Sequence, residues 1–220
     1  MAAKKKTAKK SVKRKAATKA SSGSVTDRIL DAGLDEAGLI GWRNVTMDAI
    51  ADRAGLALGQ VLIDVPSKVQ FALKLIDRVD AQTLQPVKRI DPADSPRDRL
   101  FEIMMRRFDA LNAHRDGFKS IIFASLRDPA AVPLVLCRLH TSAASILSAA
   151  GISPDGILGL MRVKGLAVVG ACALRAWLRD DSADLAKTMA ALDKALARAE
   201  KLAKLSPFRR SKRTEGAAAA

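Results

Sequence analysis

The chain of 220 residues has two cysteines, two histidines and no tyrosine. Cys137 and Cys172 form neither a disulfide framework nor a CxxC pair, so we expect two buried thiols in a reducing cytoplasm. His114 and His140 are too far apart in sequence to form an HxxxH pair. The sequence also lacks a GxxxxGK[ST] phosphate loop and a GxGxxG fingerprint after a strand. These absences indicate no metal, no cofactor and no enzyme activity.

Long uncharged apolar runs are also missing from the sequence. The most apolar region, residues 156–178, is interrupted by Arg162, Lys164 and Arg175. The uncharged stretch that remains is about ten residues, whereas a helix needs about 20 to cross a bilayer. We therefore expect no transmembrane helix.

Positive charge is concentrated at the two ends of the chain. Residues 1–24 hold nine Lys or Arg and no acid, and residues 207–220 have a net charge of +3. The remaining residues are nearly balanced, with +3 of the total +15. Both ends lack apolar periodicity, which predicts disordered basic tails. Such tails can bind the phosphates of DNA, contact an anionic membrane, or simply raise solubility.

Everything between the tails has the apolar spacing of amphipathic helices, with no sustained alternation typical of strands. This pattern predicts an all-α protein. Pro86, Pro92 and Pro96 mark a linker between an N-terminal and a C-terminal group of helices. The expected helices cover about residues 26–39, 47–54, 56–65, 67–85, 115–127, 128–151, 153–178 and 183–205, and a further helix starts at Ser95-Pro96 and includes Leu111.

Residues 41–68 carry the most informative pattern. Thr46 stands where a helix N-cap is expected, and Gly55 where a left-handed turn ends that helix. A second helical pattern follows up to Val65, and Pro66 interrupts it. Helix, short glycine turn and helix form the helix-turn-helix arrangement, whose second helix enters a DNA major groove.

These residues resemble the N-terminal domain of the tetracycline-repressor (TetR) family. The resemblance covers about residues 25–75 and rests on Gly41-Trp42, Val45-Thr46-Met47, Ile50-Ala51, Ala54-Gly55-Leu56, Gly59 and Ser67-Lys68. It implies a three-helix DNA-binding domain at residues 25–68 and a helical domain at 69–206 that binds an effector and dimerises. The expected partners are therefore DNA, a second copy of the chain and a small apolar or lipid effector.

The resemblance also assigns roles to individual residues. Thr46 and Lys68 match positions that the family uses to bind backbone phosphate, and we expect Arg43 to add a phosphate contact. Gln60, with Ala57 and Leu58, is expected to face the bases, since glutamine can pair with adenine.

The second helix departs from the family pattern at its end. Members commonly carry tyrosine, a basic residue or histidine, and then phenylalanine, where this chain has Leu62-Ile63-Asp64-Val65. This departure keeps open an alternative. Some lipid-binding proteins of ubiquinone biosynthesis keep a TetR-like fold without DNA binding, and residues 176–182 and 188–193 resemble that group. A third alternative is an architectural protein whose tails coat DNA without reading its sequence.

The C-terminal helices lead to two further expectations. Leu185, Met189, Leu192 and Leu196 form one apolar stripe, which we expect to lie in a four-helix dimer interface. Met104, Met105, Phe108 and Phe123 are expected to line an apolar ligand pocket, although at helical spacing they also fit an ordinary core.

Overall fold

A computed structural model describes residues 24–85 and 93–205. The predicted basic tails and most of the proline linker lie outside these residues, apart from Ser24 at the end of the first tail. Within the described ranges the chain forms helices and turns and no strand, which confirms the all-α prediction. The helices are α1 (Val25–Ile40), α2 (Met47–Ala54), α3 (Leu58–Asp64), α4 (Lys68–Leu84), α5 (Pro96–Asn112), α6 (Arg115–Ser125), α7 (Ala131–Ala149), α8 (Gly156–Trp177) and α9 (Ala186–Leu205).

Local sequence signals set the helix ends. The Thr46 hydroxyl accepts a hydrogen bond from the Ala49 N–H (3.1 Å), as expected of the N-cap of α2. Gly55 adopts the left-handed conformation after α2, with φ 64°. Ser95 caps α5 and Pro96 is its first residue.

Helices α1 to α4 share a core on which the N-terminal domain depends. Trp42, in the α1–α2 connection, packs against Phe71 of α4 with ring centroids 4.7 Å apart. Ile29 of α1, Ile50 of α2 and Val61 of α3 are fully buried in the same cluster. Each short helix is therefore held by tertiary packing rather than by its own propensity.

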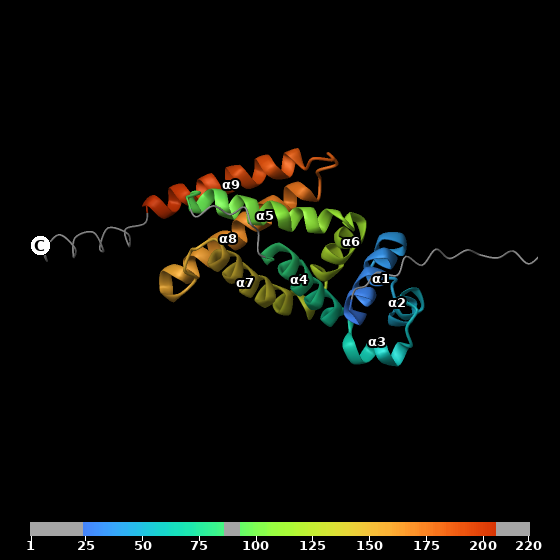
Figure 1. Cartoon of the computed structure of the whole chain (residues 1–220). Helices are drawn as coiled ribbons and strands as arrows, with labels where there is room; N and C mark the ends of the chain where they lie inside the picture. The colour runs from blue at the N-terminus through green and yellow to red at the C-terminus, as the bar shows by residue number, and fades with distance from the viewer. Residues whose placement is uncertain (1–23, 86–92, 206–220) are drawn as a thin grey trace, which may run out of the picture.

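The N-terminal domain docks against α6 of the C-terminal bundle (Figure 1). Gly117 of α6 lies so close to the Leu34 carbonyl of α1 that a Cβ at this glycine would collide with it. The Ser120 hydroxyl accepts a hydrogen bond from the Trp42 N–H at 2.7 Å. This close approach fixes the position of the first domain relative to α6.

Helix α4 joins the two domains, because its C-terminal half packs against α5 and α7. Asp80 of α4 is buried there and accepts a hydrogen bond from the Ser142 hydroxyl of α7 at 2.6 Å. Arg107 of α5 and Arg138 of α7 provide the opposite charge. The buried carboxylate is thus paired and hydrogen-bonded, as burial requires.

A buried carboxylate also holds the connection between α8 and α9. Asp180 is fully buried and accepts hydrogen bonds from the N–H and hydroxyl groups of Ser182 and Thr188. Burial alone would raise the pKa of Asp180, but these hydrogen bonds lower it far below its usual range. Leu185 follows in a left-handed conformation (φ 55°), with its side chain buried.

One expectation about α7 and α8 is corrected. Cys137 and Cys172 are exposed free thiols rather than buried ones, because they lie on the outer faces of these helices. By length and composition alone, α7 and α8 are also apolar enough to cross a membrane, which the sequence analysis did not expect. Both helices pack within the bundle, α7 against α4 and α8 against α9, so length and composition do not assign a membrane location.

We predict that Asp180→Asn lowers the free energy of unfolding by about 2 kcal/mol at pH 7, because an amide NH2 replaces an acceptor and faces the Thr188 donors. The native pKa is lowered, so the carboxylate stabilises the fold above the unfolded-state pKa of about 3.9 and loses this effect as the pH falls. The difference in the free energy of unfolding between the variant and the wild type should therefore become smaller below about pH 4.

Urea unfolding monitored by circular dichroism checks this prediction. Asp181→Asn is the control, since the Asp181 side chain is 86% exposed, and we expect a change within about 0.5 kcal/mol. An equal loss in both variants would contradict the role given to the Asp180 hydrogen bonds.

Candidate nucleic-acid interface

Helices α2 and α3 form the predicted helix-turn-helix, and two valines set the rotation of α3. Val61 and Val65 are both fully buried against the domain core. With 3.6 residues per turn, residues 59, 60 and 63 therefore lie on the opposite side of the helix. This outward face is free of the rest of the domain, and all three of its residues are exposed.

The structure separates the three residues that were expected to face bases. Gln60 is exposed on the outward face, and Ala57 is the exposed N-cap residue of α3. Leu58, in contrast, is half-buried against the core cluster, because it lies on the same side as Val61. The sequence analysis missed Ile63, which is 88% exposed on the outward face. The sequence spacing could have indicated this, because Ile63 follows Val61 by two residues and two such side chains lie on opposite sides of a helix.

Thr46 and Arg43 lie on the surface of the domain, where no other part of the domain blocks access to a DNA phosphate. Both residues are exposed at or before the start of α2. The Thr46 oxygen accepts the capping hydrogen bond, which leaves the hydroxyl hydrogen available to an acceptor such as a phosphate.

Lys68 has a structural role that the sequence analysis did not predict. Its ammonium donates to the carbonyl oxygens of Trp42 (2.9 Å) and Arg43 (3.2 Å) and lies 5.4 Å from the centre of the Trp42 ring. Partial burial lowers the pKa of the Lys68 ammonium. Two of its three N–H groups hold the α1–α2 connection, and its binding to phosphate stays a prediction.

Asp64 does not face outward with Ile63. Its carboxylate accepts a hydrogen bond from the Thr26 hydroxyl of α1 at 2.5 Å. It also lies 3.7 Å from the Lys74 ammonium of α4. Because these partners are in the neighbouring helices, the acidic residue of α3 turns toward the domain and leaves its outward face uncharged.

The domain has little free positive charge of its own. Residues 25–84 contain six Lys or Arg against nine Asp or Glu. Five of the six cations are engaged inside the domain: Arg28 with the Ala54 carbonyl, Arg53 with Glu36, Lys68 with Trp42 and Arg43, Lys74 with Asp64, and Arg78 with Asp31. Within this stretch Arg43 is the remaining cation, and it is exposed.

The architecture matches solved structures closely. A TetR transcriptional regulator from Nitrosomonas europaea aligns over 80% of this chain and 97% of its own, with 20% identity and a TM-score of 0.68. A TetR regulator from Rhodococcus sp. RHA1 covers 83% and 97%, with 19% identity and a TM-score of 0.62. A TetR-family regulator from Streptomyces coelicolor covers 89% and 98%, with 18% identity and a TM-score of 0.52.

This chain has the TetR fold. The comparison confirms the TetR-like architecture of an N-terminal helix-turn-helix domain and a C-terminal helical bundle. No protein-family model and no curated protein matches the sequence.

In this TetR fold, the leucines of the predicted dimer stripe lie inside the subunit. Leu185, Leu192 and Leu196 are at most 4% exposed, because α9 packs this face against α8 and α5. Almost none of their side-chain surface remains for contact with a second copy. The expectation that these three leucines lie in a dimer interface is therefore corrected. Met189 is the exception and is 42% exposed.

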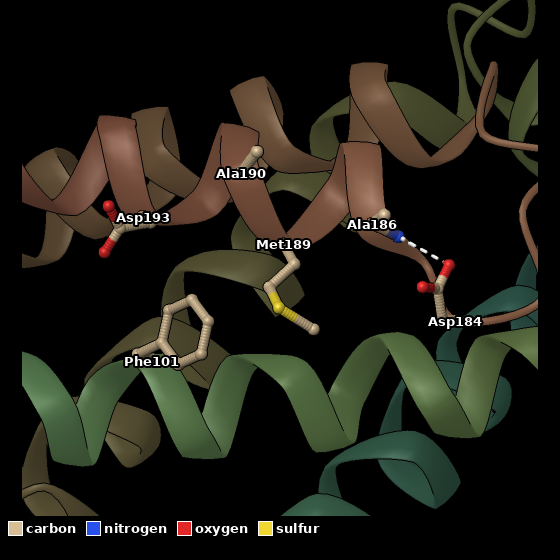
Figure 2. A pocket seen from close by; sticks show the side chains of 6 residues that line it. All are labelled: Phe101, Asp184, Ala186, Met189, Ala190 and Asp193. Atoms are coloured by element: carbon tan, nitrogen blue, oxygen red, sulfur yellow. Dashed lines mark hydrogen bonds between the residues drawn. The ribbon is translucent and has the colours of Figure 1, made fainter.

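The residues of the predicted ligand pocket differ in their burial, and the pocket stays a prediction. Met104 and Phe108 are buried core residues, Met105 is partly buried, and Phe123 is 45% exposed on α6. An open groove exists between α5 and α9, where Phe101 and Met189 point toward each other (Figure 2). Its lining residues are Phe101, Asp184, Ala186, Met189, Ala190 and Asp193.

We predict that Lys68→Ala destabilises the N-terminal domain by about 1–3 kcal/mol, because two backbone carbonyls lose their donor. Chemical denaturation followed by Trp fluorescence measures the change, since Trp42 lies at the affected site. Arg43→Ala is the matched control, because it removes an exposed cation and should leave stability within about 0.5 kcal/mol. A stable Lys68→Ala variant would show that the ammonium is free for another role.

Proposed function

We propose that the chain is a TetR-like one-component transcriptional regulator that binds DNA as a homodimer. The observation that supports this best is the outward face of α3. It is free of the domain and uncharged, because Asp64 is held by Thr26 and Lys74. A carboxylate facing DNA would repel phosphates, and this arrangement avoids it. The fold relatives are transcriptional regulators by description, which agrees with the proposal.

In this proposal the folded domain reads the DNA sequence, and the basic tail binds most of the phosphates. Sequence would be read by Gln60 and its neighbours on α3, while Arg43 and Thr46 bind phosphate. Because the other cations of residues 25–84 are engaged, most of the phosphate neutralisation would come from the nine Lys and Arg of residues 1–24. Because the tail immediately precedes α1 in the sequence, we expect it to bind the same DNA.

The outer face of α8 supports a dimer better than the stripe on α9. Ile157, Met161 and Val168 lie on one side of this helix and are 77%, 52% and 64% exposed. Gly165, on the same helix, would leave room for a partner helix, because nothing lies within 4 Å of a Cβ built there. We infer that this face of α8 packs against the same face of a second copy in a two-fold dimer.

Val168→Glu should convert the dimer to a monomer, because it places a charge in the centre of this apolar face. Sedimentation velocity at micromolar concentration measures the change. Leu126→Glu, at an equally exposed leucine after α6, should leave the dimer intact. A wild-type chain that sediments as a monomer under these conditions would overturn the dimer proposal.

Control by a small apolar effector is part of the proposal. The groove between Phe101 and Met189 offers apolar surface for such a molecule, with Asp184 and Asp193 at its rim. An apolar compound that binds the chain and shifts its DNA affinity would support this part. Compounds that bind without shifting the affinity would contradict it.

The central experiment selects duplexes from a random DNA library with the full-length chain at near-physiological salt. Fluorescence anisotropy then compares the best duplex with a scrambled one. A sequence-reading regulator should prefer its selected duplex by about a thousandfold or more. Equal, weak binding to both, together with copurifying isoprenoid or acyl lipid, would instead favour the lipid-binding alternative, in which the tails contact anionic membrane.

Three variants separate the proposed roles. Gln60→Ala should reduce the preference for the selected duplex about tenfold, whereas Arg43→Ala should weaken binding to both duplexes equally. Asp64→Asn should leave the affinity within about twofold, because the carboxylate turns away from the outward face.

Removal of residues 1–23 should weaken the affinities for both duplexes and make them depend less on the salt concentration. If this truncation instead removes all preference for the selected duplex, the tail rather than α3 carries recognition.

A further inference from the structure

The outward face of α3 is centred on an unusual residue. Ile63 is 88% exposed, more than any other large apolar side chain in the described part of the chain. A single exposed isoleucine on an ordinary surface needs no explanation. Ile63, however, lies in the second helix of a helix-turn-helix, on the side opposite buried Val61 and Val65.

The neighbours of Ile63 on this face are small or neutral. Gly59, one turn earlier, has nothing within 4 Å of a built Cβ, so it leaves the side of the helix open. Gln60 is the polar group of this face, and Asp64 is turned toward Thr26 and Lys74. A partner at this face therefore meets one amide and one branched apolar tip.

The chemistry of the major groove matches this pair of groups with one type of base pair. The thymine C5-methyl is the apolar group that the groove exposes, and a glutamine amide can bond adenine at N6 and N7. Guanine is usually read by Arg or Lys and cytosine by Asp or Glu. The outward face of α3 offers none of these charged groups.

On the basis of the proposed function, we propose that Ile63 is a specificity-determining residue that packs against a thymine methyl group. Gln60 and Ile63 are separated by about 4.5 Å along the helix axis, close to the 3.4 Å spacing of base pairs. Each half-site would therefore contain an A·T pair read by Gln60, with the thymine methyl under Ile63 in an adjacent or next-adjacent pair.

The test starts from the duplex selected by the full-length chain. Each thymine of one half-site is replaced in turn by deoxyuridine, which removes only the methyl group. At one position we expect the affinity to fall about fourfold, as for the loss of one buried methyl. Ile63→Ala should lower the affinity for the thymine duplex by a similar factor or more and abolish the difference between thymine and uracil at that position.

Two further variants serve as controls. Ile63→Val keeps a branched apolar tip and should retain most of the methyl dependence. Ile40→Ala truncates another exposed isoleucine of the same domain and should retain all of it. Circular dichroism confirms the fold of each variant, and the exposure of Ile63 predicts native stability for its truncation.

The outcomes distinguish this inference from the proposed function. A selected duplex that is preferred over its scrambled version, but is insensitive to every thymine-to-uracil change, would overturn the role of Ile63 and leave the regulator intact. The same holds if Ile63→Ala keeps the full methyl dependence. If no duplex is enriched at all, the proposed function fails, and the role of Ile63 fails with it.

Discussion

The burial of Val61 and Val65 is the constraint on which the candidate interface depends. These two side chains fix the rotation of a seven-residue helix that is too short to be stable alone. Once the rotation is set, Gln60 and Ile63 face outward, and Asp64 comes within reach of Thr26 and Lys74. Because Gln60 and Asp64 lie one turn apart, a rotation of the helix by one residue would either turn the carboxylate outward or bury both polar side chains.

A second constraint is the position of charge. The helix-turn-helix domain uses nearly all its cations for internal contacts, such as Lys68 with the Trp42 and Arg43 carbonyls. These contacts favour a rigid domain but leave little charge for phosphate. The proposed function therefore assigns affinity mainly to residues 1–24 and selectivity to α3. Affinity from the basic residues weakens steeply as the salt concentration rises. Selectivity depends on short-range contacts between α3 and the bases, so salt should lower it less.

Much of the fold was predictable because it depends on local signals. The caps at Thr46 and Ser95, the left-handed Gly55 and the apolar spacing of each helix are properties of short segments. The three leucines of the dimer stripe were predicted wrongly for a physical reason. Helical spacing shows that one face is apolar, but it does not show whether that face is covered by the same chain. Leu192 and Met104 are covered by other helices of the bundle, whereas Val168 is left open.

The sequence by itself determined the helical class, the helix-turn-helix and the separation of basic ends from a nearly neutral body. These features follow from periodicity, capping and composition, which need no long-range contact. The tertiary structure decided which polar groups are free. Lys68 is held by backbone carbonyls, and Asp64 accepts from Thr26, 38 residues away in the chain. The accessibility of a charge depends on such distant partners, because a hydrogen bond or ion pair forms only where folding brings both groups together.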